Sequence, residues 1–307
     1  MKLGVEAVVK ALRAGELAIL PTETVYGLAA DAADPRAVAA IYEAKGRPRF
    51  NPLIAHVADT PSAERLGVFD GRARQLAEVF WPGPLTLVLP AAPDCAVSDL
   101  ARAGLDTVAV RVPAHPAALA ALSGFGGPVA APSANRSGRP SPTTFADAVE
   151  EVGPAAAAGV DGGPCAVGLE STVVSVLDGP VRLLRPGAIT REALEAVIGP
   201  SAEAENDARR SPGRHAAHYA PEAPVRLDAD APRLGEAWLS FGREAAGPAE
   251  FALSPTGDLR EAAANLFAML RAADRLRPSA IAVAPIPAHG LGEAINDRLR
   301  RAAGYVG

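Results

Sequence analysis

The stretch LAILPTET at residues 17–24 indicates the kind of fold, because a short apolar run ends directly in a polar loop. Residues 17–20 are uninterrupted apolar and Pro21 follows them, which is the pattern of a short buried strand. Upstream, residues 5–12 carry apolar side chains at helical spacing, and Gly15 marks the end of that helix. A helix that leads into a buried strand and a polar loop is typical of an α/β protein.

Further strands and helices alternate irregularly along the first 200 residues. Asp34 and Pro35 combine an N-cap with proline at the first helical position, and the predicted helix extends through Ala44. Apolar runs predict strands at residues 53–57, 85–89, 108–112, 128–131, 172–177 and 181–184, and helices at residues 72–80, 116–123 and 144–151. Because this order lacks a regular βαβ rhythm, we expect a twisted mixed sheet.

Length and composition divide the chain into two domains. Its 307 residues exceed the usual size of one hydrophobic core. Residues 199–224 are polar, bounded by proline and without apolar periodicity, as linkers are. Downstream, residues 237–241 and 280–284 predict strands, and residues 259–276 and 291–302 predict helices. We expect domains at residues 1–199 and 225–307, with a linker at residues 200–224.

Charge and cysteine content exclude several classes of protein. The net charge is −5, and the first 200 residues hold 17 basic and 21 acidic side chains. Neither part therefore has the excess positive charge that is typical of a nucleic-acid-binding domain. Cys95 and Cys165 are the only cysteines and have no metal-ligand spacing around them. The N-terminus lacks a signal-peptide pattern, and no apolar run approaches the ~18 residues of a membrane span. We expect a cytoplasmic protein that does not enter a membrane.

A cluster of cations lies where a predicted helix ends. Lys45, Arg47 and Arg49 fall within five residues, and no acidic residue occurs between Glu43 and Asp59. Such a patch suits polyphosphate, which point charges and the arginine fork can bind. The alternative is an ordinary helix C-terminus, where the helix dipole favours cations. The chain has only three lysines beside 27 arginines, which hints at a specific need for lysine at this position.

A second candidate is the sequence PSANRSGRPS at residues 132–141, directly after a predicted strand. Its hydroxyls, amide and glycine supply small hydrogen-bonding groups where a strand ends, and open α/β sheets bind ligands at that edge. The alternative is a turn rich in Ser, Asn and Pro, which spacing alone favours.

Single polar residues occur on or beside apolar strands at five places. They are Thr24, His56, Arg111, Ser171 and Arg185. A polar side chain in such a position must find a partner or face a cleft. Arg111 is flanked by four apolar residues and needs an anionic partner if it is buried. A lone histidine such as His56 is more often a satisfied structural residue than a catalyst.

Common catalytic signatures are absent from the sequence. There is no HExxH, GxSxG, GxGxxG or GxxxxGK[ST] motif and no aspartate cluster. Nucleophilic and metal-hydrolase reactions therefore have no support, and a reaction that depends on positioning and charge stabilisation remains.

Taken in order, five blocks of sequence resemble the YrdC/Sua5 family of threonylcarbamoyl-AMP synthases. They are PTETVYGL (21–28), KGRPRFNPL (45–53), VRVP (110–113), APSANRSG (131–138) and ESTVV (170–174). Longer, Sua5-type members add a second domain behind a linker, which SPG (211–213) and HYAP (218–221) resemble. The resemblance implies an α/β architecture: a twisted mixed-sheet YrdC-like catalytic domain and a small Rossmann-like C-terminal domain.

The resemblance also implies a reaction and its partners. Members of the family join L-threonine, bicarbonate and ATP into threonylcarbamoyl-adenylate and pyrophosphate, with Mg²⁺ accompanying the nucleotide. Such a nucleotidyltransferase supplies the modification of adenosine 37 in ANN-decoding tRNAs. The implied partners are these small-molecule substrates and the downstream tRNA threonylcarbamoyl-transfer machinery.

Residue roles follow from the same resemblance. L-threonine is implied to contact Thr24, His56, Arg111, Ala131 and Ser171, with Arg111 as the carboxylate clamp. ATP is implied to contact Arg47, Asn51, Thr107, Ser133, Asn135, Ser141, Arg185 and Tyr219. Lys45 and Arg47 are the implied catalytic residues, which stabilise the transferring phosphate and the pyrophosphate. No protein ligand to a metal is implied. Residues 211–221 are expected to act as a lid that excludes water.

Two other functions stay open at this point. The first domain resembles modules able to bind structured RNA, although the acidic balance argues against more than weak contact. A carbamoyl-handling domain with another acceptor is the second alternative. Pyrophosphate release that depends on threonine and bicarbonate separates the synthase from both.

Overall fold

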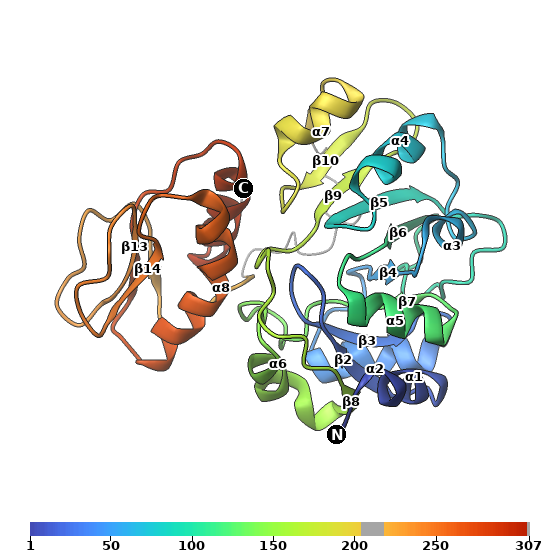
Figure 1. Cartoon of the computed structure of the whole chain (residues 1–307), viewed down its shortest axis with the longest axis horizontal. Coiled ribbons are helices and arrows are strands. Elements are labelled where there is room, and N and C mark those ends of the chain that lie inside the picture. Colours follow the sequence, from blue (N-terminus) through green and yellow to red (C-terminus); the bar gives the residue numbers. More distant parts are fainter. Residues whose placement is uncertain (204–217, 306–307) are drawn as a thin grey trace.

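The computed structural model describes residues 1–203 and 218–305, which form two α/β domains (Figure 1). The linker and lid expected at residues 200–224 and 211–221 therefore lie in large part outside the described residues. Within residues 1–203 and 218–305, no helix is both long enough and apolar enough to cross a membrane.

The larger domain is built on one mixed sheet of eleven strands. In spatial order they are β1 (Lys2–Leu3), β8 (Ala156–Gly159), β2 (Leu17–Leu20), β3 (Gly27–Asp31), β7 (Val129–Ala130), β4 (Ile54–His56), β6 (Thr107–Arg111), β5 (Leu85–Pro90), β9 (Thr172–Ser175), β10 (Arg182–Arg185) and β11 (Ala202–Glu203). β4 pairs parallel with β6, whereas β5 and β6 are antiparallel. The expected mixed sheet is confirmed.

Alternating side chains give the sheet two buried faces, because successive residues of a strand point to opposite sides. On β2, Ala18 and Leu20 join the core that contains α1 (Val5–Arg13) and α5 (Pro116–Phe125). Leu17 and Ile19 point the other way, into the core that α2 (Pro35–Lys45) shares. The apolar run at residues 17–20 is therefore an interior strand of the sheet that is buried on both faces.

The remaining helices of this domain cover the sheet and its loops. They are α3 (Thr60–Glu64), α4 (Gly71–Phe80), α6 (Phe145–Val152) with the 3₁₀ turn η1 (Gly153–Ala155), and α7 (Arg191–Ile198). The helix α2 begins at the predicted cap, where the Asp34 side chain accepts from the backbone N–H of Arg36 at 2.8 Å. It ends at Gly46 in the left-handed region (φ 59°), which turns the chain directly after Lys45.

The smaller domain has a parallel sheet in the order β12 (Val225–Arg226), β15 (Ile281–Val283), β13 (Ala237–Phe241) and β14 (Glu250–Ser254). Two helices, α8 (Leu259–Arg275) and α9 (Leu291–Ala302), pack their apolar faces on this sheet. The all-parallel pairing, with α8 connecting β14 to β15 and α9 following β15, confirms the Rossmann-like α/β expectation.

The helix α8 lies on the side of the smaller domain that faces the larger one (Figure 1). Its Arg271 donates to Glu151 of α6 at 3.0 Å, and both side chains are buried. Arg275, one helical turn later, donates to Glu150 at 2.6 Å and is half-exposed. Gly168 of the larger domain approaches α8 so closely that a Cβ built on it would lie 2.5 Å from the Cα of Ala264. Ion pairs and close main-chain packing therefore join the domains.

Candidate functional site

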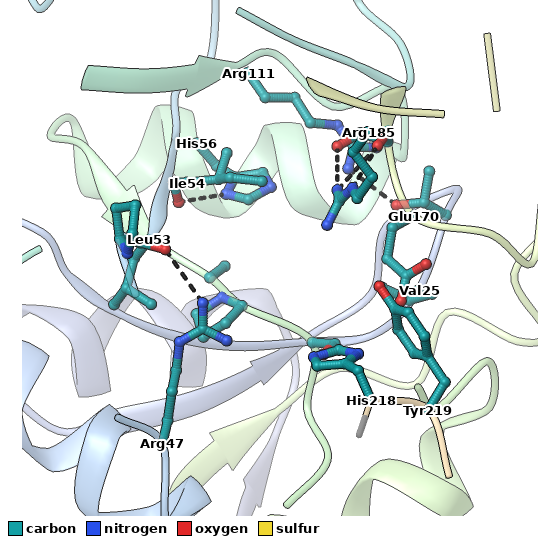
Figure 2. A pocket seen from close by; sticks show the side chains of 16 residues that line it. Val25, Arg47, Leu53, Ile54, His56, Arg111, Glu170, Arg185, His218 and Tyr219 are labelled. Carbon is teal, nitrogen blue, oxygen red and sulfur yellow. Dashed lines mark hydrogen bonds between the residues drawn. The ribbon is translucent and has the colours of Figure 1, made fainter. Parts of the chain in front are cut away.

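One pocket gathers most of the predicted site residues (Figure 2). The predicted residues that line it are Thr24, Arg47, His56, Arg111, Ala131, Ser133, Ser171, Arg185 and Tyr219. Figure 2 shows Arg47 on one side of the shared space, with Glu170 and Tyr219 on the opposite side. Segments that are far apart in the sequence thus converge on a single cavity.

Strand directions explain this convergence. The parallel strands β4 and β6 end at His56 and Arg111, which are partners in the register. β5 is antiparallel to β6 and parallel to β9, so the start of β9, next to Ser171, reaches the same edge of the sheet. β10 returns antiparallel to β9 and ends there with Arg185. Polar residues at strand ends therefore meet without any local sequence motif.

The guanidinium of Arg111 is held on three sides. It donates to the carbonyl of Gly83 at 3.2 Å, to the Thr24 hydroxyl at 3.0 Å and to the Glu23 carboxylate at 2.5 Å. Burial alone would raise the pKa of Glu23, but the charge and hydrogen bond of Arg111 outweigh it and lower that pKa. The anionic partner required by a buried arginine is thus Glu23, a residue that the sequence argument did not select.

His56 is a neutral imidazole in this pocket. Burial, and then the charge of Arg111, lower the pKa of His56 to about 3. Nδ1 lies 3.2 Å from the carbonyl oxygen of Ile54, which can only accept, so Nδ1 carries the proton. Nε2 is therefore a hydrogen-bond acceptor, suited to an N–H or O–H group of a ligand.

Lys45 fixes the loop that carries Ser133 and Asn135. Its Nζ donates to the carbonyls of both residues, at 2.5 Å for Ser133. Burial, and then the charge of Arg47, hold the pKa of Lys45 well below its ordinary value, and the two carbonyls offset part of that cost. Lys45 is outside the pocket lining, so its contact with the site as described runs through this loop.

Two further arginines line the pocket. Burial lowers the pKa of Arg47 to about 10, which leaves it charged at neutral pH. One Arg47 nitrogen donates to the carbonyl of Pro52 at 3.2 Å, while its buried Nε has no hydrogen-bond partner among the described residues. Arg185 donates to the Ser171 carbonyl at 2.9 Å and to its hydroxyl at 3.2 Å. The Ser171 hydroxyl lies 2.7 Å from that of Thr86, so its orientation is fixed.

Four other predicted residues lie outside the pocket lining. The amide of Asn135 donates to two carbonyls of its own loop, at 2.7 and 2.9 Å, and so stabilises that loop. Asn51 is buried, and its side-chain oxygen has no partner among the described residues. Ser141 donates to Glu170 at 2.6 Å. Thr107 begins β6 on the same face as Arg111 but four residues away, about 13 Å along the strand.

His218 and Tyr219 line the pocket and belong to the chain that follows residue 217. The Tyr219 ring packs on Phe267 of α8, with 5.3 Å between ring centroids, and on His218 at 4.0 Å. Burial, and then the charges of Arg47 and Lys45, hold the pKa of His218 well below its ordinary value, so it is neutral. Tyr219, which the resemblance implies contacts ATP, thus lines the pocket.

Glu170 lines the pocket but was not predicted as a site residue. Burial alone would raise its pKa, but the charges of Arg298 and Arg185 and the Ser141 hydrogen bond lower it, so the carboxylate is ionised. Glu170 is the first residue of the ESTVV block and directly precedes Ser171, and this position is the sequence signal that could have identified it.

The fold and the site together define a two-domain α/β protein whose cationic, hydroxyl-rich pocket is suited to anionic ligands. A family model described as telomere recombination, Sua5/YciO/YrdC, matches residues 10–187. A second model, described as the C-terminal domain of threonylcarbamoyl-AMP synthase, matches residues 189–304. The chain belongs to the Sua5/YciO/YrdC family.

Individual relatives cover nearly the whole chain. The threonylcarbamoyl-AMP synthase of Bacillus subtilis is 44% identical over 95% of this chain and 91% of its own. The Pyrococcus abyssi protein of that name is 41% identical over 96% of this chain and 92% of its own. The solved structure of P. abyssi Sua5 complexed with L-threonine matches with a TM-score of 0.90 at 38% identity, covering 98% of this chain and 94% of that one.

Proposed function

We propose that this protein is a threonylcarbamoyl-AMP synthase. It would join L-threonine, bicarbonate and ATP to give threonylcarbamoyl-adenylate, pyrophosphate and water. The threonine amine would take up bicarbonate as a carbamate, and the carbamate oxygen would attack the α-phosphate as pyrophosphate leaves. The observation that carries the proposal is the convergence of Arg47, Arg111 and Arg185 with the hydroxyls of Thr24 and Ser171 in one pocket.

The amino-acid side of the pocket is proposed to lie at Arg111. A guanidinium binds a carboxylate through a planar fork, the Thr24 hydroxyl bonds to Arg111, and Ser171 lines the same pocket. Neutral His56 offers an acceptor for the amine or hydroxyl of threonine. Ala131, which also lines the pocket, would contact the aliphatic part.

The nucleotide side is proposed to extend from Arg47 and Ser133 to Arg185 and Tyr219. Arg47 is half-buried and remains charged, and its buried Nε has no partner among the described residues, so it can donate a hydrogen bond to a phosphate. Asn51, Thr107, Asn135 and Ser141 would bind the nucleotide or hold the loops that do. Lys45 and Arg47 stay the proposed catalytic residues, Lys45 in part through the loop of Ser133.

Mg²⁺ would enter the pocket on the nucleotide. Glu170 is the only carboxylate among the described lining residues, and Ser141 and Arg298 already bond to it. No group of three or more His, Cys, Asp or Glu side chains suited to a metal lies among residues 1–203 and 218–305. These residues fit an ion carried by phosphate oxygens, which Mg²⁺ prefers to an all-protein cage.

Wider assignments belong to the same proposal. Because AMP would be transferred from ATP, the enzyme class would be nucleotidyltransferase. The adenylate would pass to machinery that modifies adenosine 37 of ANN-decoding tRNAs, and the compartment would be the cytoplasm. Residues 1–199 would be the catalytic domain, 200–224 the linker and 225–307 the C-terminal domain. Residues 211–221 would act as a lid, and their deletion should lower the yield of adenylate per ATP consumed.

The decisive experiment combines the full chain with ATP, Mg²⁺, L-threonine and bicarbonate and detects the adenylate by mass. Pyrophosphate release should require both threonine and bicarbonate. Arg111→Lys keeps a cation but loses the fork, and should weaken threonine use, whereas Arg74→Lys at an exposed ion pair should not. Pyrophosphate release without threonine, or tight RNA binding without any adenylate, would overturn the proposal in favour of an alternative.

A further inference from the structure

Arg298 of the C-terminal domain reaches the pocket of the larger domain. It lies on α9 and its side chain is fully buried. Its Nε donates to Glu170 at 2.9 Å, across 128 residues of sequence, and its Nη1 donates to Asp297 at 2.6 Å. Its remaining nitrogen, Nη2, has no hydrogen-bond partner among the described residues. The C-terminal domain thus places a buried positive charge next to Glu170 of the larger domain.

The guanidinium of Arg298 contacts two side chains that line the pocket. Glu170 receives Arg298 on one carboxylate oxygen and the Ser141 hydroxyl on the other, at 2.6 Å. The guanidinium carbon also lies 5.3 Å from the centre of the Tyr219 ring, whose position Phe267 supports from α8. Figure 2 shows Glu170 and Tyr219 next to each other on one side of the pocket.

The charge of Glu170 poses a physical problem for an anionic ligand. An ionised carboxylate on the wall of a buried pocket repels polyphosphate, because interactions between charges are weakly screened there. Arg185 faces the same region and shares in neutralising Glu170, but its nitrogens are also bonded to Ser171. Arg298 has the direct hydrogen bond to the carboxylate and does not line the pocket itself.

We infer that Arg298 is a positioning residue through which the C-terminal domain completes the nucleotide side of the pocket. It neutralises Glu170, so that a polyphosphate can occupy the pocket without meeting an uncompensated carboxylate. This inference rests on the proposed function, because it requires a nucleotide at this site.

The test measures binding of MgATP and of adenosine by calorimetry to four forms: wild type, Arg298→Met, Glu170→Gln and the double variant. Arg298→Met should weaken MgATP binding by about tenfold, because the Glu170 carboxylate that it leaves unpaired repels the polyphosphate. Adenosine carries no phosphate, so its affinity should stay within about threefold, or less than 1 kcal/mol. In the double variant no carboxylate is left unpaired, and MgATP affinity should return to that of Glu170→Gln.

A purely structural role for Arg298 predicts a different pattern. Adenosine and MgATP binding would then fall together, and the double variant would be as weak as Arg298→Met; either result overturns the inference. If Arg298→Met does not fold, the double variant compared with Glu170→Gln decides, since a large loss of MgATP affinity there contradicts the role. Arg298→Lys should bind MgATP better than Arg298→Met.

Controls separate this inference from the proposed function. Arg275→Met also removes an ion pair between the domains, but it lies outside the pocket lining and should leave MgATP binding unchanged. If the wild-type protein binds no nucleotide, the proposed function and this inference are both contradicted. Nucleotide binding by wild type that Arg298→Met leaves intact would sink the inference alone.

Discussion

Glu23 and Arg111 form a buried ion pair, with 2.5 Å between Oε1 and Nη2, where the proposed function puts the carboxylate of L-threonine. The same Glu23 carboxylate accepts from the backbone N–H of Ala114 at 3.1 Å, which fixes its second oxygen. A substrate carboxylate would therefore share the guanidinium with Glu23.

Replacing Arg111 by alanine should both destabilise the protein and abolish threonine binding. It leaves the Glu23 charge buried and unpaired, which costs about 3 kcal/mol of unfolding free energy. Urea denaturation measures the first effect and calorimetry with L-threonine the second. Adding Glu23→Gln should restore part of the stability but none of the binding. Equal stability of the single and double variants would contradict this account of the ion pair.

Replacing Lys45 by methionine should abolish adenylate formation while the overall fold survives. The change leaves the buried carbonyls of Ser133 and Asn135 without their donor, which costs about 1–3 kcal/mol and loosens their loop. Mass detection of the adenylate and circular dichroism provide the two measurements. Lys10→Met at an exposed position of α1 is the matched control. Turnover near the wild-type value would refute the assignment of Lys45.

Stability should decrease as the pH falls below 6.5, in part because of His56. The unfolded chain takes up a proton at about pH 6.5, whereas burial lowers the pKa of His56 to about 3 in the folded protein. Between these two pH values, the free energy of unfolding decreases by up to about 1.4 kcal/mol for each unit by which the pH falls. Urea denaturation between pH 6.5 and 5 should show this slope reduced in His56→Gln. An unchanged slope, or the same reduction in exposed His289→Gln, would contradict the prediction.

Breaking the buried pair between Arg271 and Glu151 should loosen the contact between the domains. Arg271→Met leaves Glu151 with the half-exposed Arg136 and Arg139 as its remaining basic neighbours, and should cost about 3 kcal/mol of unfolding free energy. Arg275→Met, whose side chain is half-exposed, should cost less than about 1 kcal/mol. Thermal unfolding distinguishes the two. Equal effects would mean that burial does not set the strength of these contacts.

Apolar periodicity found many of the strands with branched side chains, but not β14 (EFALS). The predicted runs at 85–89 and 108–112 correspond to β5 and β6, whose residues alternate between two buried faces. It missed β3 (GLAAD) and β8 (AAAG), because Gly and Ala have low strand propensity. These short strands exist because neighbours pair with them on both sides, which local sequence does not reveal.

Many of the residues that line the candidate site were predicted from the sequence, but the pairing among them was not. Ordered motifs identified Arg111 and Ser171, Arg185 was singled out as a polar residue beside an apolar strand, and strand directions bring the three to one edge. The partners Glu23 and Arg298 were missed, because an ion pair formed across 88 or 128 residues leaves no spacing pattern. Only the three-dimensional fold places Glu170 between the Ser141 hydroxyl and a helix of the other domain.

The absence of a side chain at Gly168 lets the larger domain pack closely against α8. A methyl group there would meet the main chain of Ala263 and Ala264, and the left-handed φ of 72° also disfavours any side chain. Even alanine at this position would act as a spacer and push α8 outward. The reach of the second domain toward the pocket thus depends on a single missing carbon atom, three residues before Ser171.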